Sequence, residues 1–358
     1  MVEEYLGEGA AGQVYKARVL SGIPTPEPYV AVKVFKSSIL EKRGQLRRIE
    51  RELEASQAVE GHYVTRVYEL GYYGGRPFLV MEYCDGGNLT EFYKHTLLFD
   101  IENVLDWARQ LFIAVRSLHS KGIVHRDIKP ENLLLKREPS PGPIQLSIRL
   151  SDLGVASIVG DKTLTKSYEF LGTIRYAAPE YLLDGNYSQY SDVYSVGLVL
   201  LFMLSGYQPY PSVRNWTKLI RLKENLDPLL QIPNRNRMKF KRAFHYFEPY
   251  DYVRFEILKA LVPRFLSFFP NDRLSADEAL SILLNHELDV RVLPYSYLLG
   301  VADALELPES MYPISDIRGL MGPKTTGRHR HVSSARFDNI WRTVSFHHAL
   351  AALLSSDM

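Results

Sequence analysis

Cysteine is almost absent from the sequence, with Cys84 as the one example among 358 residues. An intramolecular disulfide is therefore excluded, and a reducing compartment is expected. The first four residues, Met1-Val2-Glu3-Glu4, also lack the basic and apolar regions of a secretory signal peptide. Together these features predict a soluble, intracellular protein of the cytoplasm.

Excess charge of one sign and long apolar runs are lacking too. The chain carries 43 basic and 41 acidic side chains, a net charge of +2, so its charge does not favour nucleic acid or an acidic membrane as the main partner. The most apolar run, residues 193–207, contains Gly197 and is shorter than the roughly 20 residues of a membrane-spanning helix. We interpret it as a buried core helix and expect no membrane span.

The densest group of chemically active side chains lies in the stretch His125-Arg126-Asp127-Ile128-Lys129-Pro130-Glu131-Asn132. The Asp127 carboxylate can accept or orient the proton of an attacking hydroxyl, Lys129 can neutralise charge on a transferred group, and Asn132 can offer an oxygen to a hard cation. Phosphoryl transfer requires these parts. A solvated polar turn would explain any one of these residues, but not the whole ordered string.

This string resembles the catalytic loop of the eukaryotic-type protein kinases, and Lys129 is similar to the lysine of the branch directed at serine and threonine. The resemblance covers about residues 6–284. It implies a two-lobed α+β fold, with a small β-rich lobe at residues 1–83 and a larger, mainly helical lobe at residues 84–288. An insertion at about residues 212–255 and a C-terminal extension at residues 289–358 complete the expected organisation.

Three glycines, Gly7, Gly9 and Gly12, lie between two strand-like runs. Glycine lets a backbone approach phosphates closely and offer its N–H groups to them. A plain hairpin turn explains the spacing equally well, while the strand-like run that follows argues against a dinucleotide-binding fold. The resemblance implies that these glycines, with Leu6 and Val14, contact ATP.

Residues 30–35, Val-Ala-Val-Lys-Val-Phe, alternate as a strand and place Lys33 among apolar side chains. A buried lysine is costly unless it is paired, whereas a lysine on an edge strand costs little. The resemblance implies that Lys33 contacts the phosphates of ATP and pairs with an acid on the next helix. We assign that acid to Glu52, with Glu50 and Glu54 as alternatives.

That helix is expected at residues 45–59, with an apolar stripe formed by Leu46, Ile49 and Leu53. Ser56 lies one turn beyond Glu52, where the family usually packs an apolar side chain against the core. The substitution predicts a less rigid active arrangement.

An apolar strand at residues 78–82 runs into Gly86-Gly87 and resembles the hinge between the lobes of a kinase. The resemblance implies that the backbone of Glu82 and Cys84 meets the adenine edge and that Met81 guards the pocket behind it. The apolar side chains expected to enclose the adenine ring are Val14, Ala31 and Leu134. Cys84 is more typical of a small hydrophobic residue than of a reactive thiol.

Residues 136–143, Lys-Arg-Glu-Pro-Ser-Pro-Gly-Pro, contain three prolines and a glycine in their last five positions, which predicts a loop. A strand is expected at residues 144–150, and Ser151-Asp152-Leu153-Gly154 follows it. This resembles the family's Asp-Phe-Gly metal motif with Leu153 in place of Phe. The resemblance implies that Asp152 and Asn132 hold Mg²⁺, with Mn²⁺ as the alternative metal.

Residues 155–180 resemble a kinase activation segment with four candidate hydroxyls, Thr163, Thr165, Ser167 and Tyr168. A phosphate on one of them would bind Arg126 and order the segment. Taken one at a time, each hydroxyl is equally well explained as a solvent-exposed loop residue. The resemblance implies further structural contacts: Thr173 with Asp127 and Lys129, Glu180 with Arg273, and Asp192 with the backbone of the catalytic loop.

Three interpretations follow. The first is an active serine/threonine protein kinase that transfers the γ-phosphate of MgATP to protein hydroxyls, its own activation segment included. The second is a pseudokinase or scaffold that binds nucleotide and a partner without turnover, supported by Leu153, Ser56 and the short stretch before Leu6. The third, a small-molecule kinase, is disfavoured because residues 172–180 resemble an element built to receive peptide. Beyond ATP and a protein substrate, the C-terminal extension predicts either autoinhibition or partner docking, or else a plain flexible tail.

Overall fold

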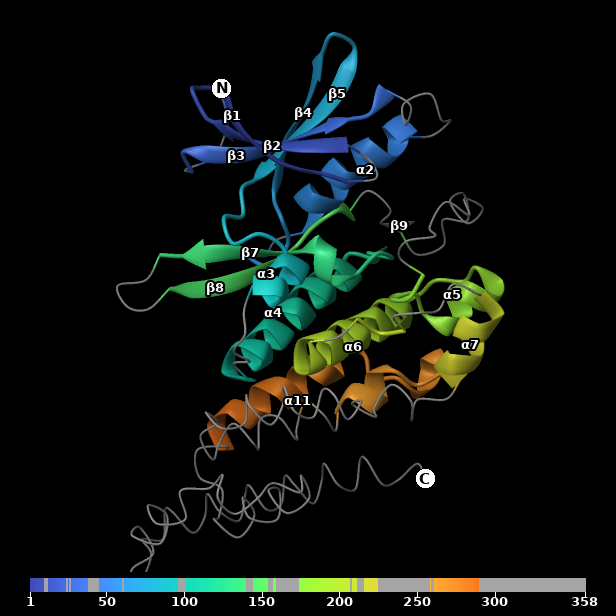
Figure 1. Ribbon diagram of the computed structural model, residues 1–358. Coiled ribbons are helices and arrows are strands. Elements are labelled where there is room, and N and C mark those ends of the chain that lie inside the picture. Colours follow the sequence, from blue (N-terminus) through green and yellow to red (C-terminus); the bar gives the residue numbers. More distant parts are fainter. Residues whose placement is uncertain are drawn as a thin grey trace, which may run out of the picture.

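The computed structural model describes residues 1–9, 12–23, 25, 27–37, 45–59, 61–95, 101–139, 144–153, 157–158, 174–206, 208–210, 216–224, 258 and 261–289. In these parts the chain forms a β-rich region, which contains the N-terminus, and a helical region below it (Figure 1). The two-lobed α+β fold expected from the sequence is confirmed. Several sequence predictions lie outside the described residues, namely those for Thr163, Thr165, Ser167, Tyr168, Thr173, the C-terminal extension from residue 290 and most of the insertion.

The smaller lobe is built on a five-stranded antiparallel sheet with the strand order β1-β2-β3-β5-β4. Its strands are β1 (Val2–Glu8), β2 (Gly12–Arg18), β3 (Tyr29–Phe35), β4 (Val67–Tyr73) and β5 (Arg76–Glu82). The helix α2 (Gln45–Ala58) packs beside this sheet and contacts β4. Ile49 joins Phe35 and Leu79 in the core between helix and sheet.

One member of the predicted apolar stripe of α2 is placed differently from the expectation. Ile49 is buried and Leu53 packs against the same core, but 47% of Leu46 is exposed. Leu46 lies in the first turn of the helix and is not among the residues of the core that Ile49 and Leu53 join. The prediction of a buried Leu46 was therefore wrong.

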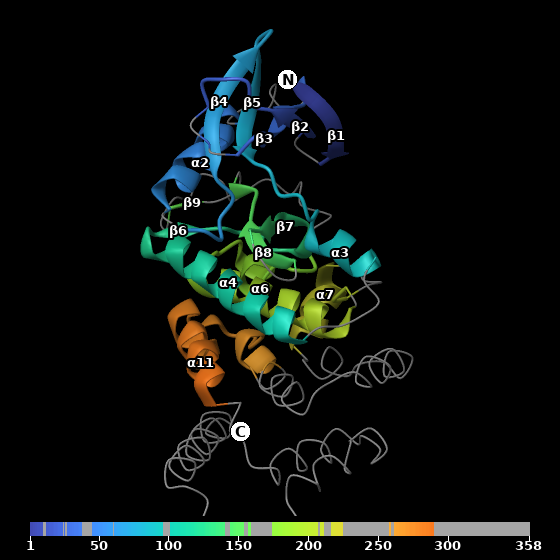
Figure 2. The same ribbon diagram turned by 90° about the vertical axis from the view of Figure 1, so that its left-hand side faces the viewer.

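The larger lobe is organised around two long helices, α4 (Ile101–Ser120) and α6 (Gln189–Ser205), which pack against each other. Figure 2 shows α11 (Ala276–Asp289) below α4, and the two helices are in contact. Shorter helices of the lobe include α3 (Leu89–His95), α5 (Pro179–Asp184), α7 (Trp216–Glu224) and the 3₁₀ turns Pro130–Asn132 and Pro270–Asp272. The interpretation of the most apolar run as a buried core helix is confirmed by α6. No helix in the described ranges combines the length and the apolar character needed to cross a membrane.

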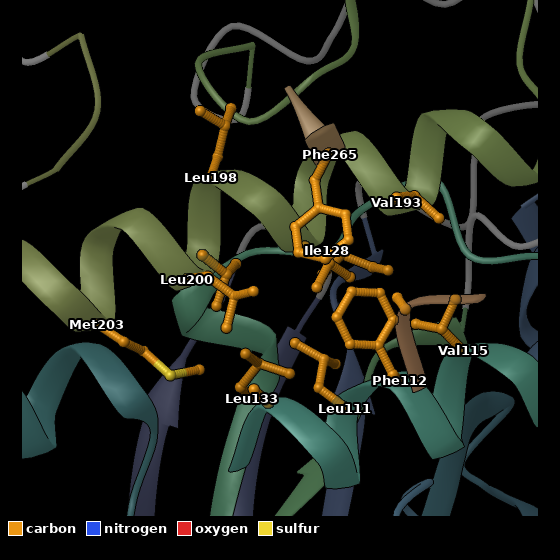
Figure 3. Packing of buried hydrophobic residues seen from close by; sticks show 14 of the residues in the cluster. Leu111, Phe112, Val115, Ile128, Leu133, Val193, Leu198, Leu200, Met203 and Phe265 are labelled. Carbon is orange, nitrogen blue, oxygen red and sulfur yellow. The ribbon is translucent and has the colours of Figure 1, made fainter. Parts of the chain in front are cut away.

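Apolar packing also anchors the stretch that carries the reactive side chains. Ile128 and Leu133 are buried in the same cluster as Phe112 of α4 and Val193 of α6 (Figure 3). The polar residues between and beside them are therefore attached to the packed core of the lobe, which has few alternative arrangements.

A β-hairpin formed by β7 (Leu133–Glu138) and β8 (Gln145–Leu150) follows, while β6 (Ile123–Val124) pairs with β9 (Ser157–Ile158). The hairpin corrects the predicted start of a loop at Lys136. Lys136, Arg137 and Glu138 continue β7 and pair with residues of β8. The sequence prediction assigned these charged residues to the same loop as the prolines that follow them. In the structure they belong to the strand instead.

Gly197 allows α6 to pack closely against the segment that follows residue 261. A Cβ atom at this position would lie 2.7 Å from Cβ of Phe265 and 2.8 Å from Cδ2 of Leu266. Contacts this short force backbone or side chains to shift, so only glycine fits without rearrangement.

We therefore expect Gly197→Ala to destabilise the protein, although alanine gains roughly 1 kcal/mol over glycine in a helix. Overpacking costs about 1–3 kcal/mol, so after the helix gain is subtracted the free energy of unfolding falls by up to about 2 kcal/mol. Chemical denaturation measures this change. Gly61→Ala is the matched control, because its Cβ would meet only Ser117 Oγ at an ordinary 3.6 Å. Equal stability of the two variants would contradict the close packing.

Candidate active site

Lys33 of β3 is buried between two carboxylates that come from different parts of the chain. Its Nζ lies 3.0 Å from Glu52 Oε1 of α2 and 3.0 Å from Asp152 Oδ1, just after β8. Of the three acids considered from the sequence, Glu52 is thus the partner, whereas Arg47 bonds Glu50 and Glu54 at the surface. Burial opposes the charge of Lys33, but the two carboxylates prevail and raise its pKa.

Ser56 connects α2 to the sheet through hydrogen bonds instead of apolar contacts. Its hydroxyl donates to the Thr65 carbonyl at 3.0 Å and accepts from the Val67 backbone N–H at 2.8 Å. All three groups are buried, and Val67 belongs to β4. The serine that suggested a less rigid arrangement therefore ties the helix carrying Glu52 directly to β4.

The catalytic-loop candidate is held from behind by Asp192 of α6, which is fully buried. Its carboxylate accepts hydrogen bonds from the backbone N–H groups of His125 at 2.8 Å and Arg126 at 2.9 Å, and lies 2.9 Å from His119 Nε2. Burial works against the charge, yet these hydrogen bonds lower the pKa of Asp192. The anchoring contact predicted for Asp192 is present.

Asp127, Lys129 and Asn132 are brought together within this loop. Lys129 Nζ lies 2.6 Å from Asp127 Oδ2, and Asn132 Nδ2 donates to the carbonyl and to Oδ2 of Asp127 at 2.8 and 3.0 Å. The second oxygen, Oδ1, is buried and has no hydrogen-bond partner among the described residues. Burial raises the pKa of Asp127 to about 6, against the opposing charge of Lys129. An unpaired carboxylate oxygen of this kind is available to a hydroxyl group.

The oxygens of Asn132 and Asp152 fit a hard divalent cation. Since the amide nitrogen of Asn132 is engaged with Asp127, the amide oxygen is the atom that remains for a metal. Asp152 uses Oδ1 for Lys33, its side chain is 42% exposed, and Lys33 lowers its pKa so that it stays ionised. One carboxylate and one amide oxygen suit Mg²⁺, which takes few protein ligands and completes its shell with phosphate and water oxygens.

The strand expected to contact adenine is β5, which ends at Glu82. The Glu82 backbone N–H donates to the Arg66 carbonyl at 2.8 Å, so an adenine contact from Glu82 has to use its carbonyl. Met81 and Ala31 lie side by side in the core, and Leu134 lies on β7. Cys84 is half-buried, and burial raises the pKa of its thiol, which keeps it protonated.

The glycine segment spans the turn between β1 and β2. Leu6 and Gly7 lie on β1, Gly12 and Val14 lie on β2, and the Gly9 N–H donates to the Gly12 carbonyl at 2.9 Å. A side chain at Gly12 would collide with the backbone carbonyl of Val34 on β3. Gly12 is therefore required by the packing of the sheet itself, whatever else the segment binds.

Glu180 and Arg273 form the ion pair expected from the sequence. Two guanidinium nitrogens lie 2.8 Å from the two carboxylate oxygens, and Ser191 Oγ donates to Glu180 at 2.6 Å. A paired arginine and carboxylate of this geometry fixes both side chains. It holds α5, and with it residues 174–178, on the core of the larger lobe.

An ionic group behind the hinge strand was missed by the sequence analysis. Glu82 Oε1 lies 2.7 Å from Lys136 Nζ and 3.2 Å from Arg149 Nε, and Arg149 also bonds Glu138 at 2.8 Å. The one signal was the alternation of polar and apolar residues in β8, which places Arg149 between two apolar neighbours. It was hidden because Lys136 and Glu138 were assigned to a loop.

Comparisons with known proteins agree with this geometry. Residues 1–284 match the family model described as protein kinase domain. CBL-interacting protein kinase 30 from Oryza sativa subsp. japonica is 33% identical over 226 residues, covering 62% of this chain and 44% of the relative. Serine/threonine-protein kinase A from Synechocystis sp. is 34% identical over 220 residues, covering 58% and 40%. Human ribosomal protein S6 kinase alpha-3 is 30% identical over 245 residues, covering 66% and 31%. The chain thus matches less than half the length of each of these relatives.

We expect Ser56→Ala to lower the free energy of unfolding by about 1–3 kcal/mol, because it leaves the buried N–H of Val67 and carbonyl of Thr65 without this partner. Denaturant unfolding measures the loss. Gln57→Ala, at an exposed position of the same helix, serves as the control and should remain close to the unmodified protein. If the two variants are equally stable, Ser56 does not tie α2 to β4.

Proposed function

The chain belongs to the protein kinase family, and on that premise we propose that it transfers the γ-phosphate of ATP to serine or threonine hydroxyls of protein substrates. The observation that carries the proposal is the arrangement of Asp127, whose one oxygen bonds Lys129 and Asn132 while the other has no partner in the described chain. Such an arrangement orients a hydroxyl beside a cation, as phosphoryl transfer requires. The kinase names of the relatives support the same activity.

The nucleotide is proposed to lie between the smaller lobe, residues 1–83, and the larger lobe, residues 84–288. Lys33 is the residue that would meet its phosphates, because Glu52 and Asp152 keep it charged and fix its position. The hinge backbone at Glu82 and Cys84 would meet the adenine, and the turn between β1 and β2 would cover the phosphates. The residues proposed to line the nucleotide site are Leu6, Gly7, Gly9, Gly12, Val14, Ala31, Met81 and Leu134.

A divalent cation, Mg²⁺ in our proposal, would be held by Asp152 and Asn132 and would neutralise charge on the transferred phosphate. Asp127 and Lys129 would orient the substrate hydroxyl and the transferred phosphate. Asp127 Oδ1 accepts the hydrogen bond of the substrate hydroxyl and so aims its oxygen at the phosphate. Lys129, 2.6 Å from the other oxygen of Asp127, places a positive charge where the phosphate arrives. Lys129 also supports the preference for serine and threonine through its resemblance to that branch.

Asp127→Asn should reduce phosphate transfer by about 10²–10⁴-fold, since the amide no longer accepts the hydroxyl proton. Transfer of labelled γ-phosphate from MgATP to the protein itself and to a basic protein substrate measures the effect. Asp184→Asn is the control, because Asp184 is exposed at the end of α5. Full activity of Asp127→Asn would remove Asp127 from the proposed chemistry. Nucleotide binding without any transfer by the unmodified protein would instead favour a scaffold.

Lys33→Met should lower kcat at least about a hundredfold, because the phosphates lose their one buried cation on β3. The same labelled-phosphate assay measures it, with Lys121→Met, an exposed lysine after α4, as the control. Since Lys33 is paired with Glu52 and Asp152, circular dichroism should verify that the variant remains folded. An unchanged rate in a folded variant would show that the phosphates bind elsewhere.

A further inference from the structure

Lys223 occupies a position of α7 where an apolar residue is expected. Leu219, one turn earlier on the same face of the helix, is buried, and Lys223 is fully buried as well. Lys218 and Arg221 of the same helix are exposed. Burying a polar group such as an amine is costly unless the group is hydrogen-bonded. A lysine retained at such a position has a defined partner.

The partner is a backbone carbonyl. Lys223 Nζ donates to the Arg175 carbonyl at 2.9 Å. The rings of Tyr194 and Tyr210 enclose the amine, with centroids 4.8 and 4.5 Å away. Burial and then the charge of Arg273 lower the pKa of Lys223 well below its usual range, although Glu180 opposes them. A neutral amine still carries N–H bonds, so the hydrogen bond to the carbonyl does not depend on the charge.

Residues 174–178 are held by two further side chains. Ser195 Oγ of α6 donates to the Tyr176 carbonyl at 2.9 Å, and the Tyr176 hydroxyl donates to Gln208 Oε1 at 2.7 Å. Burial first, and then the carboxylate of Glu131, raise the pKa of Tyr176, which keeps its hydroxyl protonated and able to donate. A stretch of five residues is thus fixed by α6, α7 and the chain after α6.

We propose that Lys223 is a positioning residue for the protein substrate, and that it acts by fixing residues 174–178 through the Arg175 carbonyl. This inference rests on the proposed kinase function, because it assigns to this segment the backbone that receives the substrate peptide beside Asp127. Lys223 is buried and touches no substrate itself. Its removal loosens the peptide platform while the nucleotide contacts, which come from other elements, stay intact.

The test compares Lys223→Met with Arg221→Met in the full chain. The substrate is a serine-containing peptide selected on the unmodified protein from a degenerate library. We expect Lys223→Met to raise KM for the peptide roughly three- to tenfold, the effect of one lost hydrogen bond, with KM for ATP changed by less than about twofold. Arg221→Met should leave both KM values unchanged.

Stability separates this role from a merely structural one. Replacing a buried amine by an apolar side chain of similar length removes the cost of burying a polar group, so Tm of Lys223→Met should not fall. Amide hydrogen exchange at residues 175–178 should nevertheless become faster in this variant and not in Arg221→Met. An unchanged peptide KM together with unchanged exchange would overturn the proposal.

Two further outcomes are decisive. If Lys223→Met does not fold, Tyr176→Phe loosens the same segment from Gln208, and a peptide KM equal to that of the unmodified protein would then contradict the proposal. If the unmodified protein transfers no phosphate, the proposed function fails, but the exchange measurement still decides whether Lys223 fixes residues 174–178.

Discussion

The ion pair of Lys33 with Glu52 and Asp152 is the interaction on which the candidate site depends. It connects β3, α2 and the segment just after β8 through a single atom, Lys33 Nζ. The lysine is stable in a buried position only while both carboxylates are near it, since an unpaired buried charge is strongly disfavoured. The orientation of α2 and the position of Asp152 are therefore set together.

The same principle recurs in the larger lobe, where a carboxylate holds each of two segments of the candidate site. Asp192 fixes the backbone of His125 and Arg126, and Glu180 fixes α5 through Arg273. Apolar packing around Ile128 and Leu133 supplies the rigid base. Apolar contacts thus determine where the loops sit, while charged groups with directional hydrogen bonds determine which way their side chains face.

Prediction from sequence succeeded where chemistry is local in the chain. The string around Asp127 indicates its own geometry, since Lys129 and Asn132 lie within five residues of it, and the buried character of α6 follows from its composition alone. Glu52 was chosen correctly from the resemblance, but the structure was needed to exclude Glu50 and Glu54, because all three acids lie on one helix and only its rotation selects between them. Leu46 and Lys136 were misplaced because the periodicity of a helix, or the composition of a loop, does not reveal where an element ends. Lys223 could not be predicted, since its carbonyl partner is 48 residues away.

The ion pair of Glu180 and Arg273 also constrains the order of folding. The two residues are 93 positions apart, so the ribosome needs about 5–20 s to add the arginine after the glutamate. During that time α5 and α6 exist without the partner that neutralises Glu180, whereas the sheet of the smaller lobe, complete by residue 82, already has all its strands. During synthesis, therefore, every strand of the smaller lobe's sheet is available before residue 273 has been added, and the larger lobe can form this ion pair only after that point.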